Sequence, residues 1–76
     1  MGKGGVIMFN LYLSIANEDF QQVYTGKDIY TAIRIIADNC DVLDKGVYTD
    51  ATILFAYITD SVGNIVFENC YNKEGI

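Results

Sequence analysis

The sequence contains no histidine and only five basic side chains among its 76 residues. Histidine is the commonest general base in enzymes, so its absence removes Ser-His-Asp and Cys-His catalytic schemes. Ten acidic residues against five basic ones give a formal charge of −5 and a sequence pI near 4.2. Binding of nucleic acid through its phosphates depends on clustered lysine and arginine, so we expect no direct contact with DNA or RNA.

Cysteine and long apolar runs are also scarce. Small disulfide-stabilised domains carry more than two cysteines and usually follow a secretory signal, so we expect Cys40 and Cys70 to be reduced. The apolar stretch near the amino terminus is interrupted by Asn10 and Ser14 and alternates with polar residues. It therefore predicts neither a signal peptide nor a membrane span.

The residues that are present describe a globular chain. Hydrophobic residues make up 51% and charged residues 20%, with six tyrosines and four phenylalanines, unlike disordered sequences. A single domain of this length buries only about 60% of its unfolded surface, so a partner or a second copy would add to its stability. Its acidity suits a basic protein surface, although net charge also serves solubility alone.

Residues 1–7 read MGKGGVI and precede a second methionine, Met8. Lys-Gly-Gly can be encoded by a purine-rich ribosome-binding sequence at a suitable distance before Met8. We therefore expect 1–7 to be a flexible leader or a translated upstream segment, and 8–76 to form the domain. This interpretation implies a low-GC bacterium or its phage, and hence the cytoplasm of the bacterial host; a cloning remnant is the alternative.

Period-two alternation predicts strands on both sides of a central segment. Residues 8–16 alternate with one apolar face, and 20–25 form a weaker strand after turn residues at 17–19. Two strongly apolar strands follow at 51–59 and 65–71. The Gly63–Asn64 pair between them suits the left-handed positions of a hairpin loop.

The segment between these strand pairs has helical spacing. Apolar side chains at i, i+4, i+7 and i+11 predict an amphipathic helix from about 27 to 39, with Thr25 and Asp28 resembling a capping box. Ile35 lies off the main stripe, where it either widens the buried face or is exposed. The stripe consists of Ile29, Ile33, Ile36 and Cys40.

These elements predict an α+β domain with an antiparallel sheet of three to four strands and one helix packed on one face. Alternate residues of the strand at 51–59 are apolar on both sides, so that strand is expected to be central and covered twice. One helix covers one side only. A partner or a second copy is the natural cover for the side carrying Ile53, Phe55 and Tyr57.

No motif in the chain specifies a chemistry. Glu18 with Asp19, or Asp38 with Asp41, could do acid–base work only inside a pocket that separates their pKa values. The aspartates also lack the spacing of a calcium loop, and no phosphate-binding loop precedes the helix. Cys40 is expected to be a small buried hydrophobe rather than a reactive thiol. We predict no enzyme activity, no cofactor and no metal.

The stretch DNCDVLDKGVYTD, residues 38–50, is the most unusual feature. Aspartates at the end of a helix oppose its dipole and cost a few tenths of a kcal/mol each, only partly offset by an Arg34–Asp38 pair. Tyrosine adjoining acids is a common interface composition. Turn chemistry is the plain alternative, because Asp and Asn also end helices and build turns.

The whole chain resembles the small acidic phage-encoded inhibitors called anti-CRISPR proteins. The likeness rests on size, the lack of histidine, the acidic stretch 38–50, the hairpin ILFAYITDSVGNIVFEN and the leader. The resemblance implies a protein that occupies the basic nucleic-acid channel of a CRISPR effector by presenting carboxylates in place of phosphates.

The leading hypothesis is therefore a non-enzymatic inhibitor that binds a host nucleic-acid-binding protein by DNA mimicry. The alternative is a self-associating structural or regulatory phage module that dimerises through the exposed sheet face. The partner-binding residues expected for the inhibitor are Asp38, Asp41, Asp44, Tyr48 and Asp50.

Overall fold

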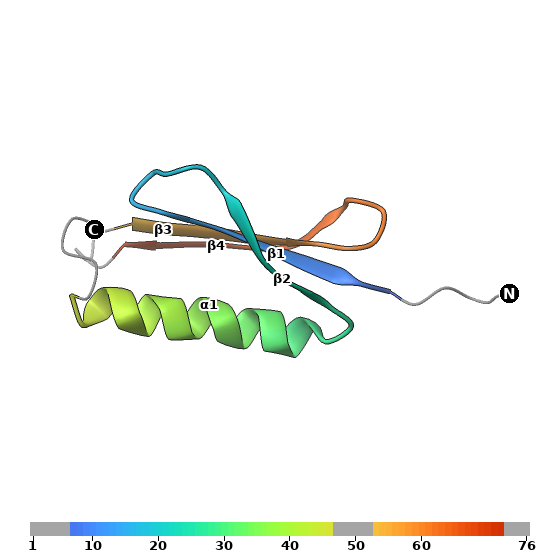
Figure 1. Cartoon of the computed structure of the whole chain (residues 1–76), viewed down its shortest axis with the longest axis horizontal. Coiled ribbons are helices and arrows are strands. Elements are labelled where there is room, and N and C mark those ends of the chain that lie inside the picture. The colour runs from blue at the N-terminus through green and yellow to red at the C-terminus, as the bar shows by residue number, and fades with distance from the viewer. Residues whose placement is uncertain (1–6, 47–52, 73–76) are drawn as a thin grey trace, which may run out of the picture.

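The computed structural model describes residues 7–46 and 53–72. In chain order the elements are β1 (Phe9–Ile15), β2 (Gln21–Gly26), α1 (Ile29–Asp44), β3 (Ile53–Thr59) and β4 (Ile65–Asn72). The strands form one sheet in the order β2-β1-β3-β4, with every neighbouring pair antiparallel. The single helix lies on one face of this sheet (Figure 1), so the predicted α+β fold is confirmed.

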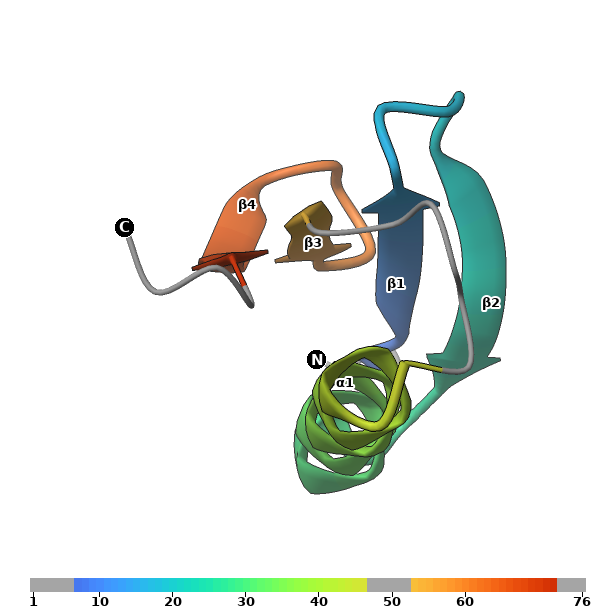
Figure 2. The same ribbon diagram turned by 90° about the vertical axis from the view of Figure 1, so that its left-hand side faces the viewer.

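The core lies between α1 and the strands nearest to it. The end-on view places α1 beneath β1, while β4 stands to one side (Figure 2). Accordingly α1 packs against β1, β2 and β3. Alternate residues of the two central strands meet one stripe of the helix, as their period-two and helical spacings require. The buried apolar residues are Leu11, Leu13, Ala32, Ile36, Leu43, Leu54, Ala56 and Ile58.

The helix begins and ends later than its predicted bounds. Asp28 is the N-cap: its carboxylate accepts hydrogen bonds from the Tyr30 backbone N–H and the Thr31 hydroxyl, both at 2.9 Å. The capping box expected at Thr25 is wrong, because the Thr25 hydroxyl instead donates to Asn10 Oδ1 across the sheet at 2.8 Å.

At its other end the helix continues five residues beyond the expected stop at 39. Leu43 lies seven residues after Ile36, returns to the same stripe and is fully buried, which favours another turn. Gly46, at φ +74°, ends the helix as a left-handed glycine. Ile35 packs against the core and widens the buried face.

Each hairpin has its own turn chemistry. Between β1 and β2 the left-handed residues are Ala16 and Asn17, at φ 59° and 63°. Between β3 and β4 only Gly63 is left-handed, so the prediction for Asn64 is wrong. Asn64 instead donates its backbone N–H to Asp60 Oδ1 at 2.9 Å, and Val62 donates to the same oxygen at 3.0 Å. These hydrogen bonds hold the pKa of Asp60 below its ordinary value, and the bond from the Asn64 backbone N–H is the main cause.

Candidate protein-interaction surfaces

The first candidate surface is the end of α1, where three of the expected partner-binding residues lie. Asp38, Asp41 and Asp44 occur at intervals of three within the helix, and all three are exposed. They therefore lie on the last turns of the helix rather than in a loop. Asp38 and Asp41 lie on its outer side, whereas Asp44, four residues after Cys40, lies on the side toward β4. Tyr48 and Asp50, the other two expected residues, lie outside the described part of the chain.

Internal partners occupy two of these three carboxylates. Asp41 Oδ2 lies 3.0 Å from Lys45 Nζ, in an i, i+4 ion pair. Asp44 accepts a hydrogen bond from the Tyr71 hydroxyl on β4. Asp38 has no ion pair among residues 7–46 and 53–72, so the predicted Arg34–Asp38 pair is absent there. Arg34, Asp38, Asp41 and Lys45 follow one another along the outer side at helical spacing, which gives a surface of mixed sign.

The Asp44–Tyr71 bond ties the end of the helix to an edge strand. Because Asp44 accepts a hydrogen bond from the Tyr71 hydroxyl and its charge opposes ionisation, the pKa of Tyr71 rises to about 12. Nearby, burial raises the pKa of the Cys40 thiol, with the Asp44 charge as a further cause. Cys40 packs against the core, as expected for a small hydrophobe, and both it and the exposed Cys70 are free thiols.

The second candidate surface is the sheet face that α1 leaves uncovered. Tyr12 of β1 and Tyr57 of β3 are opposite each other in the strand register. Their rings stack with centroids 4.8 Å apart, at an angle of 22°. Phe20, in the loop before β2, packs edge-on against Tyr57 with centroids 5.0 Å apart. The result is a continuous row of three aromatic rings across two strands and a loop.

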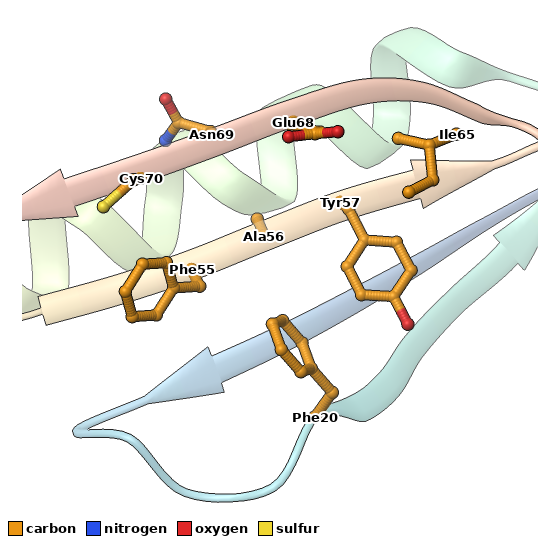
Figure 3. A pocket seen from close by; sticks show the side chains of 8 residues that line it. All are labelled: Phe20, Phe55, Ala56, Tyr57, Ile65, Glu68, Asn69 and Cys70. Carbon is orange, nitrogen blue, oxygen red and sulfur yellow. The ribbon is translucent and has the colours of Figure 1, made fainter.

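An open trough lies beside this row, with a volume of about 520 Å³. The rings of Phe20, Phe55 and Tyr57 project on the side of the sheet away from α1 (Figure 3). Phe20 remains 47% exposed although it packs on Tyr57. We call this feature the aromatic trough; it is lined by Phe20, Phe55, Tyr57, Ile65, Glu68 and Cys70, with Ala56 and Asn69.

Glu68 is the one charged side chain among the residues that line the aromatic trough. It is opposite Tyr57 in the pairing of β3 with β4 and is exposed. Two further exposed carboxylates, Glu18 and Asp19, precede Phe20 in the β1–β2 loop. Glu68 thus places negative charge beside the apolar rings, whereas Glu18 and Asp19 line a separate hollow with Ile15 and with Asn39 of α1.

The sequence predicted part of this second surface. Ile53, Phe55 and Tyr57 were expected on the face away from the helix, and all three are half-buried there. The contribution of Phe20 was missed, because Phe20 was assigned to the start of a strand that begins at Gln21. Its apolar side chain next to Glu18 and Asp19 in a turn was the available signal. The stacking of Tyr12 on Tyr57 required the β1–β3 register, which sequence alone does not supply.

Other classes of site find little support in the residues that the structure describes. Those residues contain no group of three or more side chains able to hold a metal ion. Across the same residues, α1 is too short and too polar to span a bilayer. Comparison with protein families, curated proteins and solved structures finds no match for this chain.

Proposed function

We propose that this chain is a non-enzymatic protein-binding domain, and that the aromatic trough receives a segment of a partner protein carrying both apolar and basic side chains. The observation that carries the proposal is the row of aromatic rings on the sheet face opposite α1. A row of this kind is costly to leave in water, and it matches the aromatic-rich centre of protein interfaces.

The apolar part of the binding energy would come from the rings. A buried aromatic side chain contributes about 150–250 Å² of contact area, with little conformational entropy to lose. Tyr57 is already held by Tyr12 on one side and Phe20 on the other. A partner therefore meets a surface whose central ring is fixed in place, which lowers the entropic cost of binding.

The charge of the partner follows from the surroundings of the aromatic trough. Glu68 lines it, and the whole chain carries a formal charge of −5. Lysine or arginine on the partner would complement this field and accelerate encounter. A second copy docked on this face would bring its own Glu68 to a surface that already carries one, which makes a basic partner the better fit for the aromatic trough.

Selection from a random peptide library displayed on phage tests the proposal without knowledge of the natural partner. We expect the folded domain to enrich peptides that combine aromatic or aliphatic residues with lysine or arginine. Phe55→Ser should abolish the enrichment. Val62→Ser is the matched control, since Val62 is 80% exposed in the β3–β4 loop away from the aromatic trough.

Two results would contradict the proposal. One is no enrichment by the wild-type domain; the other is enrichment that survives Phe55→Ser in a variant whose circular dichroism spectrum is unchanged. A wild-type domain that dimerises in light scattering, and becomes monomeric only on Phe55→Ser, would instead assign this face to self-association.

The second candidate function is the acidic inhibitor of a nucleic-acid-binding protein such as a CRISPR effector. The observation that favours it is the exposure of Asp38 and Asp41 on the outer side of α1. In a pull-down from host lysate, Asp38→Asn with Asp41→Asn should then release a basic nucleic-acid-binding protein that the wild type retains. Unchanged retention would exclude this role for the helix.

A further inference from the structure

The outer edges of the sheet differ in how well they are protected. Among the residues that the structure describes, no strand lies beside the outer edge of β2 or of β4. β2 has six residues and is interrupted at Val23, because Leu11 is opposite Tyr24 while Tyr12 is opposite Gln22. Bulges and short length are common protections of an exposed edge.

The edge of β4 lacks this protection along most of its length. Its one irregularity is at Val66, next to the hairpin loop, and Phe67–Tyr71 then pair regularly with β3. The helix packs mainly against the other three strands and reaches β4 through the Asp44–Tyr71 hydrogen bond, so it does not cover the outer edge of β4, which stands to one side (Figure 2). Backbone groups on such an edge are a template for another strand.

The side chains of β4 restrict how a second β4 could pair with it. Two antiparallel β4 strands related by a two-fold axis normal to the sheet keep each side chain on the same face in both copies. Because residues opposite each other must share a face, the axis must lie midway between one residue and its own copy. Below, the axis is named by that residue. An axis at Glu68 would place two carboxylates directly opposite each other, which is destabilising. An axis at Phe67 would draw the Val66 irregularity into the centre of the pair.

An axis at Asn69 avoids both problems. It places Phe67 opposite Tyr71 of the second copy on the α1 side of the sheet, and Glu68 opposite Cys70 on the other side. Aromatic cross-strand pairs are stabilising. Tyr71 is already held by its hydrogen bond to Asp44, so one ring of each pair is preorganised. The two Asn69 side chains, half-buried in the single chain, face each other on the axis.

We propose that two copies of this chain pair antiparallel through Phe67–Tyr71 of β4, centred on Asn69, to form one continuous eight-stranded sheet. The aromatic troughs of the two copies then lie on the same face of the joined sheet and remain open. The dimer contact shares Glu68, Asn69 and Cys70 with the lining of the aromatic trough, whereas the rings of Phe20, Phe55 and Tyr57 come from the β1–β2 loop and β3 and take no part in the pairing. Each copy carries a charge of −5, so salt screens the repulsion between copies and raises the affinity of the dimer. Salt also screens the attraction to a basic partner and therefore lowers the affinity for that partner.

Single-cysteine cross-linking tests the pairing and its register. Asn69→Cys in a Cys40→Ser, Cys70→Ser background places two cysteines opposite each other, with Cα atoms about 4.5–5.5 Å apart. We expect mild oxidation to give a covalent dimer. Cys70 alone, in a Cys40→Ser chain, is about 8 Å from its copy and should not cross-link. Gln22→Cys on the other edge, in the same cysteine-free background, is a second control.

Sedimentation of the unlinked protein tests the dimer itself. We expect Asn69→Lys to raise the dissociation constant about tenfold or more, since it places two like charges opposite each other on the axis. Gln22→Lys, the same amide-to-lysine change on β2, should leave it unaltered.

Three results would overturn the proposal. The first is a wild-type protein that stays monomeric at its highest soluble concentration in high salt. The second is a dimer that cross-links through Cys70 and not through Asn69→Cys. The third is a dimer that persists in Asn69→Lys but is lost in Phe55→Ser, which would place the contact on the sheet face.

Discussion

Ala16 adopts a left-handed backbone conformation that alanine rarely takes. At φ 59° its Cβ approaches the following carbonyl oxygen, a strain of about 1–2 kcal/mol that glycine does not suffer. We expect Ala16→Gly to stabilise the domain by about 0.5–1 kcal/mol in urea unfolding, after the added freedom of the unfolded chain.

Asn17, at φ 63°, provides the control for this substitution. Asparagine tolerates the left-handed region, so Asn17→Gly should give a smaller gain. A loss of stability in Ala16→Gly, or equal gains at both positions, would contradict the assigned turn.

The Tyr71 hydroxyl makes stability depend on alkaline pH. Its pKa is about 12 in the folded chain against an ordinary value of 10.0, so folding favours the protonated phenol. The contribution is fully present below pH 10 and is lost as pH rises through 12, because the unfolded state releases its proton first. Tyr71→Phe should remove this dependence.

Urea unfolding of wild type and Tyr71→Phe between pH 9 and pH 12 measures the effect. We expect the difference in unfolding free energy between the two to shrink across the window as the wild type loses its advantage. Tyr24→Phe is the comparison, since the Tyr24 hydroxyl donates to the Asp28 backbone carbonyl rather than to a carboxylate. A wild-type advantage that stays constant to pH 12 would show that the Asp44 bond does not form.

At the level of the helix, Asp28 is the residue that defines the start of α1. Its carboxylate accepts both the Tyr30 N–H and the Thr31 hydroxyl. We expect Asp28→Ala to cost about 1 kcal/mol of unfolding free energy, in the range for loss of an N-cap. Asp38→Ala should be neutral or slightly stabilising, because it places a better helix former near the negative end of the dipole. Equal effects of the two changes in thermal unfolding would argue against the cap.

The secondary-structure pattern in the sequence was sufficient to predict the elements but not their ends. Alternation placed four strands correctly, and helical spacing placed α1 between the second and third of them. The helix was ended at 39 because Asp and Asn favour turns. Burial of Leu43 outweighs that local preference, and burial is a property of the packed chain.

The same limit applies to the candidate sites. Spacing alone predicted a dense acidic surface around Asp38, Asp41 and Asp44. It could not predict that Lys45 and Tyr71 would each engage one of these carboxylates. It did predict the uncovered face at Phe55 and Tyr57, since one helix covers one face of a sheet.

For the molecule as a whole, the two faces of the sheet have different roles. One face and α1 form the core that stabilises a short chain. The other presents aromatic rings with the Glu68 carboxylate beside them, on a chain whose net charge is negative. The outer side of α1, by contrast, carries Arg34 and Lys45 as well as Asp38 and Asp41. The aromatic trough is therefore the stronger candidate for partner binding.

The most direct test of this claim is a nuclear magnetic resonance titration of the labelled domain with a peptide enriched from the displayed library. We expect the largest amide shifts at Phe55, Tyr57 and Glu68, and in the loop at Phe20, with α1 nearly unchanged. Shifts concentrated at Asp38 and Asp41, with the sheet face unaffected, would contradict the claim and return binding to the helix.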